Sequence, residues 1–182
     1  MNPEIRESLK AEILDKALKF GDFTLASGKK SKYYINCKTV ALDARGSYYA
    51  GLNLLGLIPG EAEAVGGLTL GADPLISSVT VLSHIEKRPL RGFIVRKEKK
   101  DHGTQSQIEN CPPKGSKVVI VDDVITTGGS ALKAAEAALE NGLNVILALC
   151  LVDRMEGGEE AFKKLGIPMA SVFKIEEFLK NR

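Results

Sequence analysis

Two adjacent carboxylates followed by a turn rich in hydroxyls and glycine are the residues of this chain best suited to chemistry. Asp122 and Asp123 come directly after the apolar run at 118–121, and the sequence continues V-I-T-T-G-G-S. Glycines let backbone N–H groups point at one anion, and threonine and serine hydroxyls are further donors. A helix that begins near Ser130 adds its unpaired N–H groups and the positive end of its dipole. These features predict a cradle for a phosphate group.

The class of phosphate ligand follows from the two acids and from a missing motif. The chain contains no G-x-x-x-x-G-K-[ST] sequence, which argues for a single phosphate ester over a nucleoside triphosphate. Adjacent carboxylates repel a phosphate unless they face ribose hydroxyls, a magnesium ion or both. We therefore predict a sugar phosphate as the ligand. The alternative is an ordinary strand-to-helix turn whose hydroxyls only cap the helix.

A long polar stretch is the second candidate for anion binding. It begins R-K-E-K-K-D-H-G at Arg96, and no apolar periodicity returns until Val118. A solvated charge run is the ordinary explanation. The cations, however, follow directly from a predicted core strand, where a ligand edge is expected, and long loops of this kind are usually functional. The local concentration of positive charge favours a small polyanion over a long polymer.

Four further residues have two explanations each. Arg154 follows an apolar strand and has the planar fork that suits a carboxylate, but a surface ion pair is equally consistent with the sequence. Tyr33 and Tyr34 can belong to the core or flank a planar ligand. His84 is interpreted as a structural or surface histidine.

Alternating strands and helices are expected to position these residues. Strands are predicted at 62–65, 92–95, 118–121, 145–152 and 170–173. Helices are predicted from residue 3 to Gly21, at 43–55, 73–82 and 159–165, from near Ser130 to Asn141, and through Phe178. A hairpin is predicted around residues 27–30. The order indicates an α/β fold with a mostly parallel, doubly wound sheet, which binds ligands at the carboxyl ends of its strands.

Composition narrows the class of protein further. The 182 residues, 44% of them hydrophobic, fit one domain over 1–182 with a full core. A net charge of +2 does not indicate nucleic acid as a partner. The three scattered cysteines are typical of free thiols in a reducing cytosol, and neither a signal peptide nor a membrane span is apparent. We therefore expect a cytoplasmic protein that binds neither nucleic acid nor membrane.

Three segments carry a resemblance to a known family. The residues at 118–130 closely resemble the phosphoribosyl pyrophosphate (PRPP) motif of type I phosphoribosyltransferases. The segment F-T-L-A-S-G-K-K-S-K-Y-Y at 23–34 and R-K-E-K-K-D-H-G at 96–103 are similar to the N-terminal segment and the catalytic loop of orotate phosphoribosyltransferases. The resemblance implies transfer of the phosphoribosyl group of PRPP to orotate, giving orotidine 5′-monophosphate and pyrophosphate in UMP biosynthesis. It also implies magnesium, carried mainly by PRPP, and a homodimer with shared active sites.

The same resemblance implies a role for each matching residue. Residues 1–40 would form a hood over the base site. Catalytic roles fall on Lys100, His102, Asp122 and Asp123. PRPP binding falls on Arg96, Lys97, Lys100, His102, Asp122, Asp123, Val124, Ile125, Thr126, Thr127, Gly128, Gly129 and Ser130, and orotate binding on Thr126, Arg154, Tyr33 and Tyr34.

Two departures and two competing functions accompany this prediction. Ala26 and Leu70 stand where many members of the family have a cation, so pyrophosphate is expected to depend more on the loop after Arg96. A purine phosphoribosyltransferase would share the PRPP motif but lack the 23–34 segment and Arg154. A regulatory module that senses PRPP without catalysis would be expected to lose the acids or the loop cations.

Overall fold

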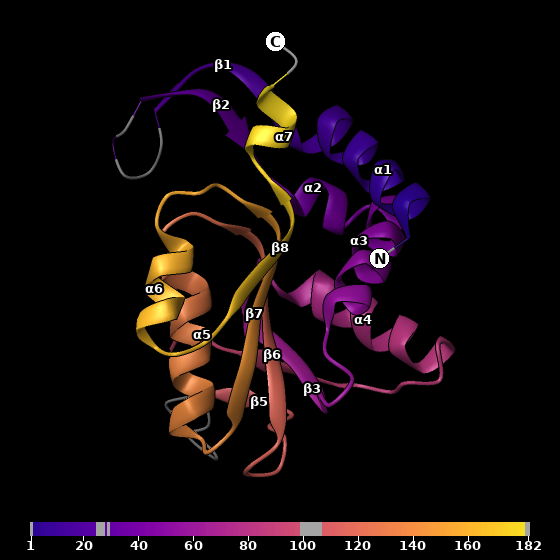
Figure 1. The fold of residues 1–182 in the computed structure, drawn as a ribbon, viewed down its shortest axis with the longest axis vertical. Helices are drawn as coiled ribbons and strands as arrows, with labels where there is room; N and C mark the ends of the chain where they lie inside the picture. The colour runs from indigo at the N-terminus through magenta and orange to yellow at the C-terminus, as the bar shows by residue number, and fades with distance from the viewer. Residues whose placement is uncertain (1, 25–27, 29, 99–106, 181–182) are drawn as a thin grey trace.

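The computed structural model describes residues 2–24, 28, 30–98 and 107–180 (Figure 1). In these ranges, six strands form one sheet in the order β5-β4-β3-β6-β7-β8. Neighbouring strands run parallel except for β5, which pairs antiparallel with β4. The strands are β3 (Ala64–Leu68), β4 (Arg91–Val95), β5 (Ile108–Glu109), β6 (Lys117–Ile125), β7 (Asn144–Asp153) and β8 (Met169–Lys174). The predicted mostly parallel α/β sheet is confirmed.

Helices cover both faces of this sheet, as the two sides of Figure 1 show. One face carries α1 (Pro3–Glu12), α3 (Ala44–Leu57) and α4 (Asp73–Ile85), and the other carries α5 (Gly129–Glu140) and α6 (Gly158–Lys164). Each face has its own apolar cluster, because buried residues of β3, β6 and β7 alternate between the two sides. The buried residues of α5 are all alanines, and Leu139 is 43% exposed. None of the helices in the described ranges is long and apolar enough to cross a membrane.

The N-terminal segment differs from its prediction. Asn2 caps α1 as expected, since its side chain accepts a hydrogen bond from Glu4 N. The helix does not continue to Gly21, however: it ends in the π-helical turn η1 (Ile13–Ala17), and Gly21 lies in strand β1 (Leu18–Thr24). The reason is the hairpin, because Leu18 turns extended to pair with Ile35 of β2 (Lys30–Ile35). The predicted hairpin is therefore present, and it begins earlier than expected.

Short elements connect the hairpin and the sheet to the rest of the chain. The helix α2 (Lys38–Ala41) follows β2, and α7 (Glu176–Leu179) follows β8. The strand predicted at 62–65 extends further, so that Gly66 and Gly67 lie inside β3. A Cβ atom on Gly66 would stand 2.3 Å from the Phe93 ring, and one on Gly67 would stand 2.3 Å from Val121 O. Close packing against β4 and β6, and not a turn, therefore requires these two glycines.

Candidate active site

The two acids lie inside β6, not after it. Pairing with β7 continues to Ile125 and Asp153, so the strand predicted to end at residue 121 extends four residues further. The change of polarity at Asp122 was misread as the end of a strand, because buried strands seldom carry consecutive carboxylates. Both residues are buried, at 7% and 6% exposure. The acids thus sit on a rigid element, and the turn follows them directly.

The turn after β6 lies at the start of α5, where the phosphate cradle is predicted. Gly128 is the N-cap residue of α5 and has φ +87°. This left-handed backbone conformation favours glycine. A cavity of about 210 Å³ opens here, lined by Asp122, Val124, Ile125, Thr126, Thr127, Gly128, Gly129 and Ser130. Ile125 is 1% exposed, and its carbonyl oxygen accepts a hydrogen bond from Arg154 N. The arrangement suits one phosphate group at a helix N-terminus.

The acid pair has unusual electrostatics. Asp123 N donates a hydrogen bond of 2.9 Å to Asp122 Oδ1, while Asp123 Oδ2 lies 3.2 Å from Lys38 Nζ. Burial raises the pKa of Asp122 to about 7, and the neighbouring Asp123 carboxylate adds to the increase. Ionising both acids in the free site therefore costs free energy. A ligand that brings hydroxyl groups or a cation would reduce this cost.

A second cavity of about 340 Å³ adjoins the acids. It is lined by Lys38, Leu68, Thr69, Leu70, Gly71, Lys97, Asp122, Asp123, Val124 and Ser130. A cis peptide bond joins Thr69 to Leu70, and Thr69 Oγ1 donates a 2.7 Å hydrogen bond to Asp73 Oδ2. A Cβ atom on Gly71 would stand 2.9 Å from Asp123 Oδ1 and 3.0 Å from Asp122 Oδ1. The loop between β3 and α4 therefore lies directly against the two acids.

Arg154 lies at the end of β7, beside the cradle. Its backbone N–H donates to Ile125 O, and its guanidinium carbon is 5.1 Å from the centre of the Tyr33 ring. The Arg154 side chain is 10% exposed, forms a 2.9 Å ion pair with Glu156, and has a buried Nε without a hydrogen-bond partner. The fold therefore brings Tyr33 of the hairpin to an arginine more than a hundred residues away in sequence, at the same edge as Thr126.

The other predicted site residues differ in their distance from the two cavities and in their partners. Tyr34 alternates with Tyr33 along β2, is 43% exposed, and contacts the Phe23 ring at 5.7 Å, so it does not share the Arg154 contact. Lys97 lines the larger cavity, whereas Arg96 forms a 2.7 Å ion pair with Glu109 of β5. Lys100 and His102 lie outside the described residues. His84 is exposed in the last turn of α4, as expected for a surface histidine.

Sequence reasoning missed Lys38, which contacts Asp123 and lines the larger cavity. No motif marks it, because its partner is 85 residues away. The only signal in the sequence was the presence of a lysine shortly after the predicted hairpin.

Known proteins resemble this chain over most of its length. Residues 64–170 match the family described as the phosphoribosyl transferase domain. The orotate phosphoribosyltransferase of Thermosynechococcus vestitus is 51% identical over 175 residues, 96% of this chain and 93% of that protein. The crystal structure of orotate phosphoribosyltransferase from Aeropyrum pernix is 37% identical, with a TM-score of 0.79 over 97% of this chain and 96% of that one. The Mycobacterium tuberculosis H37Rv orotate phosphoribosyltransferase in complex with PRPP is 31% identical, with a TM-score of 0.78 over 94% and 97% of the two chains.

The family match over residues 64–170, together with the parallel sheet and the cavity at the carboxyl end of β6, indicates the class, that of the phosphoribosyltransferases. Within this class the chain belongs to the orotate phosphoribosyltransferase family, whose members match it almost from end to end. The family predicted from the residues at 23–34, 96–103 and 118–130 is thereby confirmed.

Proposed function

We propose that this protein transfers the 5-phosphoribosyl group of PRPP to orotate, giving orotidine 5′-monophosphate and pyrophosphate in UMP biosynthesis. The observation that carries the proposal is the meeting of three features at one sheet edge. These are the cradle after β6, the buried acids Asp122 and Asp123, and Arg154 stacked on Tyr33. Together they offer separate places for a phosphate, a ribose and a planar carboxylate.

The 5-phosphate is assigned to the cradle and the ribose to the acids. N–H groups at the start of α5 and the hydroxyls of Thr126, Thr127 and Ser130 would hold the phosphate. Asp122 and Asp123 would accept hydrogen bonds from the ribose hydroxyls, which are donors suited to carboxylates. This placement directs the pyrophosphate toward the larger cavity, which Asp122, Asp123 and Ser130 also line.

The reaction needs electrostatic stabilisation more than covalent catalysis. As pyrophosphate leaves the anomeric carbon, positive charge develops on the ribose and negative charge on the leaving group. The acids lie beside the expected cation, and Lys97 lines the cavity expected to hold the anion. We assign Lys100 and His102 to the leaving group as well, and Arg96 would join them by exchanging its Glu109 partner for pyrophosphate.

Orotate is assigned to the space beside Arg154. The guanidinium fork would bind the orotate carboxylate, since paired N–H donors match two carboxylate oxygens. Tyr33 orients the guanidinium by stacking beneath it, and residues 1–40 would act as a hood over the base. Thr126 would donate to orotate from the cradle side. Tyr34 points to the face of the hairpin opposite to that of Tyr33, and it would contact the base only from that face.

Magnesium is proposed to arrive on PRPP, where it would neutralise part of the pyrophosphate charge. In the described ranges no three histidine, cysteine or acidic side chains gather as a metal site. The two buried acids nevertheless fit a ligand that brings a cation, because ionising both in the free protein is costly. Asp122 and Asp123 would then hold the ribose of the magnesium-bound substrate.

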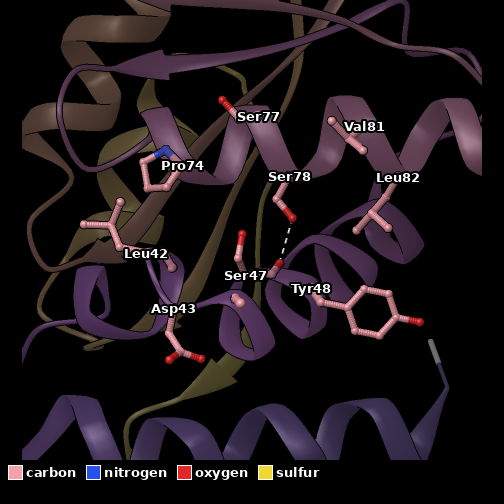
Figure 2. A pocket seen from close by; sticks show the side chains of 11 residues that line it. Leu42, Asp43, Ser47, Tyr48, Pro74, Ser77, Ser78, Val81 and Leu82 are labelled. Atoms are coloured by element: carbon pink, nitrogen blue, oxygen red, sulfur yellow. Dashed lines mark hydrogen bonds between the residues drawn. The ribbon is translucent and has the colours of Figure 1, made fainter.

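We also propose a homodimer that forms through the apolar face shared by α2, α3 and α4. A pocket of about 510 Å³ lies there, and Figure 2 shows Leu42, Tyr48 and Val81 around it. Leu42 is 71%, Tyr48 51% and Val81 61% exposed, an unusually apolar surface for an isolated chain. Pro74, at the start of α4, lines the same pocket, so this face continues toward the loop that carries Leu70. A second copy here would lie close enough to share the active site.

The dimer is tested by the molar mass in light scattering. Val81→Glu places a charge on the proposed interface and is expected to give a monomer with reduced turnover. Leu139→Glu is the matched control, because Leu139 is an exposed apolar residue of α5, on the other side of the sheet. A dimer that survives Val81→Glu as well as Leu139→Glu would place the interface elsewhere.

A cytoplasmic location is proposed from the thiols. Cys37, Cys111 and Cys150 are free, and Cys37 and Cys150 are buried. Free buried thiols are typical of proteins that work in a reducing compartment.

The base specificity distinguishes this function from that of a purine phosphoribosyltransferase. Purified protein is mixed with PRPP and magnesium and with orotate, adenine, guanine or hypoxanthine, and nucleotide products are separated by chromatography. Orotidine 5′-monophosphate is expected as the product, since Arg154 has no partner on an uncharged purine. A purine nucleotide formed in preference would overturn the proposal, and PRPP binding without any product would favour the sensing module.

A further inference from the structure

Lys38 brings a positive charge from the hairpin segment into the substrate cavity. It begins α2, shortly after β2, and its Nζ lies 3.2 Å from Asp123 Oδ2. The same side chain lines the 340 Å³ cavity together with Leu70 and Lys97. An ion pair thus ties the segment that covers the proposed base site to one of the proposed ribose acids.

The position of this lysine is fixed while its ammonium stays accessible. The Thr39 hydroxyl lies 2.8 Å from Asn36 O and 3.0 Å from Lys16 O, which anchors the first turn of α2. The Lys38 side chain is 41% exposed, whereas that of Asp123 is 9% exposed. The ammonium of Lys38 therefore remains able to meet a ligand.

The cavity needs such a cation. Pyrophosphate carries several negative charges, and the acids beside it add two more carboxylates. The β3–α4 loop supplies no positive side chain, since residues 68–71 read Leu-Thr-Leu-Gly and Leu70 is 64% exposed. Among the described residues that line this cavity, the cations are Lys38 and Lys97.

We propose that Lys38 is a PRPP-binding residue that holds the pyrophosphate end of the substrate. In the free protein its ammonium pairs with Asp123; on binding it contacts a pyrophosphate oxygen, and Asp123 turns its carboxylate to the ribose. This role supplies from α2 the charge that the loop lacks at Leu70. The inference rests on the proposed function for the identity of the substrate.

The test compares two variants of Lys38, one double variant that places a lysine at position 70, and one control variant in the hairpin. Lys38→Ala is expected to raise the KM for PRPP about 10- to 100-fold, the factor that a charged hydrogen bond carries, with the orotate KM within about twofold. Lys38→Arg should recover most of the affinity. Lys32→Ala is the matched control, because Lys32 also pairs with an acid, Asp22, but lies 86% exposed and away from the cavity. In the double variant, Leu70→Lys is added to Lys38→Ala. The new lysine returns a positive charge to the same cavity and should restore the PRPP KM.

Two results would overturn the role of Lys38. One is an unchanged PRPP KM in Lys38→Ala; the other is an equal loss for PRPP and orotate that neither Lys38→Arg nor Leu70→Lys repairs, which would indicate a structural ion pair. Calorimetric titration with PRPP and magnesium alone keeps this test separate from that of the proposed function. Wild-type protein that binds PRPP but does not consume orotate would remove the proposed reaction, while the loss of PRPP affinity in Lys38→Ala would still be measurable.

Discussion

Replacing Asp122 with asparagine is predicted to stabilise the free protein at neutral and alkaline pH. Asp122 is 7% exposed and stands beside a second buried carboxylate, so its negative charge costs free energy in the folded state. Asparagine removes this charge and keeps an oxygen that can accept the hydrogen bond from Asp123 N. Asp122, which is proposed to hold the ribose, thus lowers the free energy of unfolding of the free protein.

The size and the pH range of the effect follow from the shift in pKa. Burial, with the Asp123 charge, raises the pKa of Asp122 from 3.8 to about 7. At 1.36 kcal/mol per unit, the full shift corresponds to about 4 kcal/mol, which is an upper bound. Between about pH 4 and pH 7 the folded state holds a proton that the unfolded state has lost, so the free energy of unfolding falls as pH rises through this range. The gain from Asp122→Asn should be small near pH 4 and reach about 2 to 4 kcal/mol near pH 8.

Urea unfolding at a series of pH values measures this difference. The free energy of unfolding of wild-type protein should fall relative to that of Asp122→Asn as pH rises from about 4 to about 8. Asp22→Asn is the control, because Asp22 is 82% exposed and should leave the pH dependence unchanged. Parallel curves for wild type and Asp122→Asn, or a variant less stable at high pH, would refute the reasoning. Turnover should be lost in the same stabilised variant.

Three further predictions concern the substrate contacts. Lys100→Ala should lower turnover by orders of magnitude with little effect on stability, and near-normal steady-state turnover would refute the role of Lys100. Arg154→Ala should raise the KM for orotate by about 100-fold and leave that for PRPP within about twofold, since the fork meets only the carboxylate; an unmoved orotate KM would contradict it. Gly128→Ala should cost about 1 to 2 kcal/mol in urea unfolding and weaken PRPP binding, because alanine is strained at φ +87°. Gly129→Ala, with no atom within 4 Å of the added Cβ, should leave stability nearly unchanged, and equal losses in both variants would argue against strain at Gly128.

The sheet and the cradle could be predicted from the sequence because their signals are local. Apolar runs that alternate with helix-forming segments define the strands, and T-T-G-G-S directly before a helix defines the anion site. The end of β6 could not be predicted in the same way. Its continuation through Asp122 and Asp123 depends on pairing with β7, which outweighs the polarity of two acids. Gly21 was misplaced for a similar reason, since pairing with β2 decides where the first helix ends.

Side-chain partners across the fold were the least predictable part of the site. The pairing of Lys38 with Asp123 and the stacking of Arg154 on Tyr33 join residues that only the tertiary structure brings together. Arg96 was expected to bind PRPP, and in the free protein it pairs with Glu109 instead. The PRPP and orotate contacts of individual residues stay predictions, those of Lys100 and His102 among them.

The measurement that tests the central claim most directly is the ultraviolet absorbance of orotate after purified protein is mixed with orotate, PRPP and magnesium. Each component is omitted in turn as a control. A fall in absorbance that requires all four components is the predicted result, and it would leave only the residue roles to be tested. Unchanged absorbance, with PRPP binding still detected by calorimetry, would contradict the proposed reaction and point to another base or to a sensing module.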